Sequence, residues 1–242
     1  MDRIENLDFC IRYLMEQDRV QADIPEGLHD KRQMLRALMN VWEPQPLSDE
    51  FLKAQDAELQ AQLADKGVVE PGQGLWQGDI TRLKADAIVN AANCRGLGCW
   101  HPLHACIDNA IHSAAGLQLR RACNDTLRGG EIATGDAIVT PAFNLPSRWV
   151  IHTVGPIIAT GIPTREQERQ LAECYRTCLR LAVDKGCRSI AFCCISTGEF
   201  HFPNLRAAEI AVEACKDAPI QVIFNVFKDI DYAIYRELLG AH

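Results

Sequence analysis

The segment Asp86-Ala87-Ile88-Val89-Asn90-Ala91-Ala92-Asn93, with the loop 94–106 that follows it, decides the fold of this chain. The run 87–89 is apolar and β-branched, which is typical of a short buried strand. Polar and small residues follow it, and a helical pattern covers 104–115. A buried strand that passes through a polar loop into a helix predicts an α/β fold.

The same pattern continues along the chain. Further apolar runs lie at 137–139, 149–151, 189–192 and 220–224, and further helical patterns lie at 166–186, at 204–215 and from Tyr232 onward. This alternation predicts a largely buried sheet with helices on both faces. Ligands of such folds bind at the carboxyl ends of strands, which directs attention to the loops after Val89, Ile195 and Val226.

The first 66 residues have a different character. Apolar residues recur at helical spacing between Ile4 and Leu14, between Met34 and Trp42, and after a predicted N-cap at Ser48. We therefore predict a helical N-terminal extension over 1–66, a connector over 67–74 and an α/β domain over 75–242. The extension is interpreted as an appendage packed on the main domain, with a lid or a recognition surface as the alternative.

Composition limits the classes of function. The net charge of −7 disfavours a nucleic-acid-binding protein, because phosphate contacts need a basic surface. No signal peptide and no membrane-length apolar stretch is visible, so we expect a cytoplasmic protein without membrane contact. In that reducing compartment the 11 cysteines would be core residues, metal ligands or nucleophiles rather than disulfides.

The loop after Val89 contains the pattern Cys99-x4-His104-x-Cys106. Two thiolates and an imidazole suit zinc, and three protein ligands leave an open fourth position, as a catalytic zinc needs. His101 and Cys94 are possible substitute ligands. Chance neighbourhood in a cysteine-rich chain is the alternative, and the spacing alone names no reaction.

Several motifs in this chain resemble those of the macrodomain family. They are Gly78-Asp79-Ile80-Thr81, Asp86 to Asn93, Ile107-Asp108-Asn109-Ala110-Ile111-His112, Ala114-Ala115-Gly116, and Ile195-Ser196-Thr197-Gly198 with Phe200 and Pro203. The resemblance covers about residues 75 to 240. It implies a three-layer α/β/α macrodomain with a central mixed sheet.

The segment 98–106 departs from ordinary hydrolytic macrodomains, which carry a run of glycines there. It resembles the zinc-dependent macrodomains, a microbial branch that removes ADP-ribose from proteins and also carries a helical N-terminal extension. The resemblance implies one zinc ion held by Cys99, His104 and Cys106, with ADP-ribose and an ADP-ribosylated protein as partners.

The resemblance also implies roles for residues that would bind ADP-ribose. Asp79 and Ile80 match positions that contact adenine, Phe227 matches an aromatic that stacks on adenine, and Asn225 is expected near the proximal ribose. A helix or turn cap is the alternative role for Asp79, and a core position is the alternative for Phe227.

The remaining matches concern the diphosphate and the distal ribose. Ser196, Thr197 and Gly198 would hold the diphosphate through backbone N–H groups. Asn93 and Phe200 would contact the distal ribose, and Asn93 is also a candidate catalytic residue. Glu199 belongs to the same loop, and its role stays open. Asp108 would act in catalysis, with a ligand-orienting role or a simple helix-dipole interaction as alternatives.

The resemblance therefore implies a zinc-dependent, glycosidase-type hydrolase that removes ADP-ribose from mono-ADP-ribosylated protein. A non-catalytic ADP-ribose-binding module and a phosphatase acting on ADP-ribose 1''-phosphate are the main alternatives. A redox-responsive or metal-sensing protein is a further one.

Overall fold

The computed structural model describes residues 2–72 and 74–240, so residue 73 of the predicted connector and the terminal residues 1 and 241–242 lie outside the described residues. The strands are β1 (Gly74–Gln77), β2 (Ala87–Ala91), β3 (Ala137–Pro141), β4 (Trp149–Thr153), β5 (Ser189–Phe192) and β6 (Gln221–Val226). The helices are α1 (Arg3–Asp18), α2 (Leu28–Asn40), α3 (Asp49–Lys66), α4 (Ile107–Ala115), α5 (Leu117–Leu127), α6 (Arg165–Asp184), α7 (Asn204–Cys215) and α8 (Asp229–Leu238), with a 3-10 turn η1 (Ile80–Arg82).

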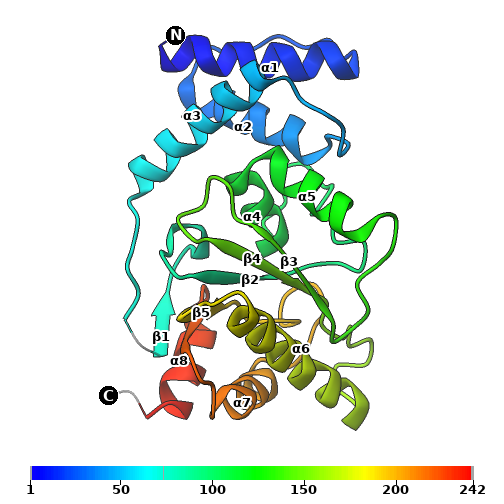
Figure 1. Cartoon of the computed structure of the whole chain (residues 1–242), viewed down its shortest axis with the longest axis vertical. Coiled ribbons are helices and arrows are strands. Elements are labelled where there is room, and N and C mark those ends of the chain that lie inside the picture. The colour runs from blue at the N-terminus through cyan, green and yellow to red at the C-terminus, as the bar shows by residue number, and fades with distance from the viewer. Residues whose placement is uncertain (1, 73, 241–242) are drawn as a thin grey trace.

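The strands form one mixed sheet in the order β1-β6-β5-β2-β4-β3. Neighbouring strands are parallel except β3 and β4, which are antiparallel. Figure 1 shows α4 and α5 on one side of this sheet and α6, α7 and α8 on the other. The predicted three-layer α/β/α architecture with a mixed sheet is thus confirmed.

The central strands are apolar because helices cover both faces of the sheet. Strand β2 is buried along 87–90, and its side chains join one core with those of α4, α6 and α7. Cys193, which follows β5, is one of the cysteines that lie in this core. The parallel strands β1, β2, β5 and β6 end at the same edge of the sheet, so the loops that follow them meet there.

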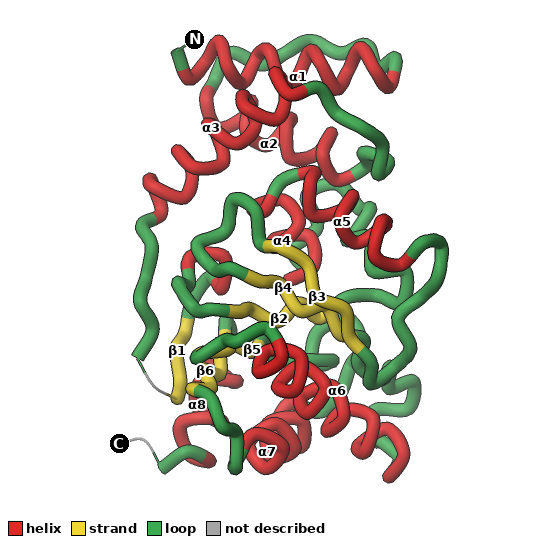
Figure 2. Tube along the Cα trace, viewed as in Figure 1, coloured by secondary structure: helices red, strands yellow, loops and turns green. Residues whose placement is uncertain are grey.

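Helices α1, α2 and α3 build a second core of their own, with Trp42 and Phe51 among its largest buried side chains. Figure 2 shows these helices gathered beyond α4 and α5, on the side away from α6 and α7. Leu117 at the start of α5 packs in this second core, and its N–H donates to the buried Gln55 of α3 at 2.9 Å. The N-terminal helices are therefore packed against the α4–α5 layer.

Local signals explain where several elements begin. Cys106 occupies the N-cap of α4, so this helix starts at Ile107 rather than at the predicted residue 104. Ser48 caps α3 by accepting from the N–H of Phe51, as its position predicts. None of the described helices combines the length and the apolar composition needed to cross a bilayer.

Candidate active site

A cavity of about 960 Å³ lies along the edge where the parallel strands end. Its walls come from the segments that follow β1, β2, β5 and β6, so the three loops selected from the sequence line one space. Helices α2 and α3 supply the facing wall, through residues that include Arg36 and Lys66. The volume falls within the range of pockets that bind whole small molecules.

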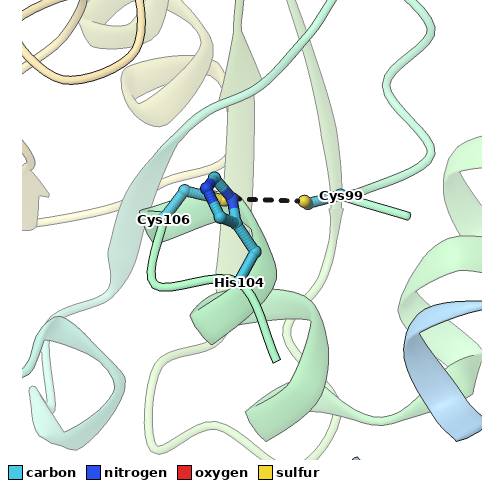
Figure 3. Close-up of side chains that lie close together, drawn as sticks. All are labelled: Cys99, His104 and Cys106. Carbon is cyan, nitrogen blue, oxygen red and sulfur yellow. Dashed lines mark hydrogen bonds between the residues drawn. The ribbon is translucent and has the colours of Figure 1, made fainter. Parts of the chain in front are cut away.

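Residues 97–106 form a loop that is called the metal-binding loop after the ligands predicted for it, and this loop brings two thiols and one imidazole together. The Sγ atom of Cys99 lies 3.5 Å from Nδ1 of His104 (Figure 3). The two sulfur atoms and one ring nitrogen of His104 all lie within 4.8 Å of one another. Zinc bonds of about 2.3 Å to sulfur and about 2.0 Å to nitrogen place a sulfur and a nitrogen ligand of a tetrahedral site about 3.5 Å apart, and two sulfur ligands about 3.8 Å apart. The chemistry and spacing of these donors therefore fit zinc.

The substitute ligands considered from the sequence lie outside this group. His101 and Cys94 are both exposed, and neither belongs to the cluster of converging ligand atoms. Burial raises the pKa of the Cys106 thiol to about 12, so a bound cation would have to stabilise its thiolate.

Asp108 lies beside this cluster in the first turn of α4. Its side chain is almost fully buried; Oδ1 accepts from Nδ2 of Asn90 at 2.7 Å, and Oδ2 accepts from Nδ2 of Asn93 at 3.4 Å. Burial raises the pKa of Asp108 to about 6, against the opposing effects of the Asn90 hydrogen bond and the charge of Arg120. A carboxyl group with this pKa exchanges protons near neutral pH, as general acid–base chemistry requires.

A series of buried polar side chains leads away from Asp108, beginning with Asn90. The amide of Asn90 also contacts Nδ1 of His152 at 3.1 Å, and Nε2 of His152 lies 2.9 Å from Oγ1 of Thr140. The side chain of Asn90 thus links Asp108 to His152. Burial lowers the pKa of His152 to about 3, so this imidazole is neutral.

His112, Cys123 and His152 form a second group of converging ligand atoms, and all three are buried. None of them lines the cavity. Burial holds the pKa of His112 well below its usual range, and its ring nitrogens have no hydrogen-bond partner among the described residues. His112 is thus a buried residue of α4 that lies away from the cavity wall.

Asp79 takes the cap position that the sequence offered as its alternative role, and it is also placed on the cavity wall. It caps η1 by accepting from the N–H of Thr81 at 3.0 Å, and it also lines the cavity. Its Oδ2 lies 3.0 Å from Nζ of Lys66 in α3. Burial acts to raise the pKa of Asp79, but the hydrogen bonds from Thr81 and the charge of Lys66 outweigh it and lower the pKa.

Three further residues predicted to contact adenine or its ribose also line the cavity, and they differ in exposure. Phe227 is 75% exposed and lines the cavity, so it is not a core residue. Ile80 is buried with part of its surface on the cavity wall. Asn225 also lines the cavity, but its Nδ2 donates to the carbonyl of Gly78 at 3.0 Å and so joins β6 to the turn after β1.

The loop after β5 contributes Ser196, Thr197, Gly198, Glu199 and Phe200 to the cavity wall. Ser196 has a left-handed backbone (φ 65°), which bends the chain sharply after the strand. The exposed Glu199 places Oε1 3.8 Å from Nε2 of His104, so this loop reaches the metal-binding loop.

Sequence reasoning missed the cavity residues of the N-terminal helices. Arg36 donates to the carbonyl of His104 at 3.1 Å, and Lys66 pairs with Asp79 at the other end of the cavity. No motif marks either residue, because each lies in an ordinary helical pattern. Their positions depend on how α2 and α3 pack against the α/β domain.

Known proteins share both parts of this architecture. A family model described as Macro domain matches residues 89–211. A protein of Treponema medium named Protein-ADP-ribose hydrolase is 45% identical, in an alignment that covers 99% of this chain and 100% of that protein.

Solved macrodomain structures are similar as well. The Oceanobacillus iheyensis macrodomain with ADP is 41% identical with a TM-score of 0.62, covering 69% of this chain and 88% of that one. The Trypanosoma brucei macrodomain in complex with ADP-ribose is 30% identical with a TM-score of 0.61, covering 85% of this chain and 95% of that one.

Proposed function

This chain belongs to the macrodomain family, and we propose that it is a zinc-dependent hydrolase that removes ADP-ribose from mono-ADP-ribosylated protein. One observation carries the proposal: the sulfur and nitrogen atoms of Cys99, His104 and Cys106 converge beside the buried carboxyl group of Asp108. Both features line the cavity, which continues from there to Asp79 and Phe227.

ADP-ribose would lie along this cavity with its adenine between Asp79 and Phe227. The carboxylate of Asp79 suits the exocyclic amino group of adenine, and the exposed ring of Phe227 offers a stacking surface. Backbone N–H groups of 196–198 would hold the diphosphate. The distal ribose would then meet Asn93, Phe200 and Asp108 at the end nearest the metal-binding loop.

The reaction would exchange the protein side chain on the anomeric carbon for a hydroxyl group from water. The bond between this carbon and the side-chain heteroatom breaks, and the released side chain takes up the other hydrogen of the water. The amides of Asn90 and Asn93 hold the two oxygens of Asp108. We propose that Oδ2, which has the longer contact, accepts the proton of the water. A zinc ion held by the three loop ligands would supply a Lewis-acidic centre that orients and polarises the bound sugar.

The experiment compares two cysteine variants of one loop. Cys99→Ser should lose at least a hundredfold in the rate of ADP-ribose release from a modified protein, while Cys94→Ser, at the exposed cysteine outside the ligand group, should keep it. Both variants should bind free ADP-ribose within a few-fold of the wild type, because adenine and diphosphate contacts lie elsewhere. Equal turnover of the two variants would contradict the zinc-dependent mechanism.

Asp108→Asn separates hydrolysis from binding. The amide has a similar shape but cannot accept a proton, so release should fall about 10²- to 10⁴-fold while ADP-ribose binding persists. Wild-type protein that binds ADP-ribose without releasing it from any modified protein would instead favour a non-catalytic binding module.

A further inference from the structure

Helix α2 of the N-terminal extension contacts the metal-binding loop directly. The loop contains no helix or strand of its own, and two of the three candidate ligands, Cys99 and His104, lie within it away from any regular element. Their positions therefore depend on bonds from neighbouring segments. The side chains that supply such bonds include Asn40 and Arg36 of α2, and Arg120 of α5.

Asn40 holds the loop at its most unusual backbone position. Leu103 has φ 59°, a left-handed conformation that residues other than glycine rarely adopt. The N–H of Leu103 donates to Oδ1 of Asn40 at 2.9 Å, one residue before the ligand His104. Asn40 is 2% exposed, and its Nδ2 donates to Oγ of Ser113 in α4 at 3.0 Å, which fixes the direction of the amide.

Arg36 holds the second half of the loop. Its Nη2 donates to the carbonyl of His104 at 3.1 Å and to Oδ1 of Asn109 at 2.6 Å. Asn109 in turn donates through Nδ2 to the carbonyl of His101 at 3.0 Å, and its N–H donates to Sγ of Cys106 at 3.4 Å. One guanidinium thus stabilises the backbone of one ligand and a residue that touches another.

Arg120 joins the end of α2 to the first half of the loop. Its guanidinium donates to the carbonyls of Asn40 at 3.0 Å and Trp42 at 2.6 Å, and to the carbonyl of Leu97 at 2.7 Å. A cation at a helix C-terminus is electrostatically favourable. Arg120 is 3% exposed, so the loop, α2 and α5 form one hydrogen-bonded unit.

We propose that Arg36 and Asn40 are positioning residues through which the N-terminal helices set the affinity of the loop for zinc. The inference rests on the proposed function, because it takes zinc as the ion that Cys99, His104 and Cys106 bind. Neither residue touches the ion; each fixes the backbone that presents a ligand. The N-terminal extension is on this account a structural part of the metal centre and not a separate appendage.

The test measures zinc affinity in the full-length protein by competition with a chromogenic chelator. Arg36→Ala and Asn40→Ala should each bind zinc at least about tenfold more weakly, the loss typical when groups that orient metal ligands are removed. Arg32→Ala is the matched control, because Arg32 lies one turn earlier in α2 and donates to Glu58 and Asp65 of α3 rather than to the loop. Its zinc affinity should stay within twofold of the wild type.

Conservative variants keep the test valid if an alanine variant fails to fold. Asn40→Asp retains an acceptor oxygen for the N–H of Leu103 and should bind zinc close to the wild type, whereas Arg36→Lys loses the forked donor geometry and should bind more weakly. If Arg36→Ala, Asn40→Ala and Arg36→Lys match the wild-type zinc affinity, the inference is overturned while the proposed function stands. If the wild type itself binds no zinc, both fail.

Discussion

Replacing Phe227 by alanine should weaken ADP-ribose binding without unfolding the protein. The side chain is 75% exposed, so about a quarter of its surface is covered in the folded chain. Full burial of a phenylalanine contributes about 1.5–3 kcal/mol, and a quarter of that is about 0.5 kcal/mol of folding free energy. The structural cost of Phe227→Ala is therefore small.

The binding cost should be much larger. Stacking of a base on an aromatic ring contributes about 1–3 kcal/mol, which corresponds to a Kd for ADP-ribose raised by about 5-fold to about 150-fold. Phe227→Tyr retains the ring and should stay close to the wild type. Ile230→Ala is the matched control, since Ile230 is 58% exposed near the start of α8 but does not line the cavity.

Isothermal titration calorimetry with ADP-ribose measures these affinities, and urea denaturation measures the folding free energies. A Kd for Phe227→Ala within twofold of the wild type would refute the assignment of this ring to adenine. A loss of several kcal/mol of folding stability would refute the argument from exposure.

Two further predictions concern the fold around the site. Gly98→Ala should lower the free energy of unfolding by about 1–3 kcal/mol, because Gly98 has φ 83° and an added Cβ would lie 2.8 Å from the ring of His112. Gly72→Ala is the control, since an added Cβ there would have nothing within 4 Å, and equal urea midpoints for the two variants would contradict the clash. Lowering the pH from 7 to 4.5 should cost the wild type about 2–3 kcal/mol of folding free energy through His152, because its folded pKa of about 3 lies below the ordinary 6.5 and the unfolded chain takes up the proton first. His152→Gln should lose this part of the pH dependence and His29→Gln, at an exposed histidine, should retain it; identical pH profiles would contradict the buried neutral imidazole.

The sequence predicted the architecture because buried strands and helix faces consist largely of apolar residues. The apolar runs at 87–89 and 189–192 lie in buried strands, and the helical pattern at 204–215 matches α7. Strand β1 has a weaker sequence signal than these, because Gly74–Gln77 is short, begins with glycine and pairs with β6 alone. Helix α5 was missed because Gly116 both ends α4 and begins α5, so no loop separates them.

The part of the candidate site that was predictable consists of residues that lie close together in the sequence. Cys99, His104 and Cys106 belong to one short loop, so their spacing alone brought them into consideration as a group. Arg36 and Asn40 lie more than 60 residues away from the loop segments that they contact. Such contacts depend on the packing of helices, for which a single sequence carries no local signal.

Metal analysis of the purified full-length protein, combined with an assay of ADP-ribose release, tests the central claim most directly. The account predicts one zinc ion per chain, release that is lost when a chelator removes the ion, and release that returns when zinc is added back. Full turnover by metal-free protein would contradict it.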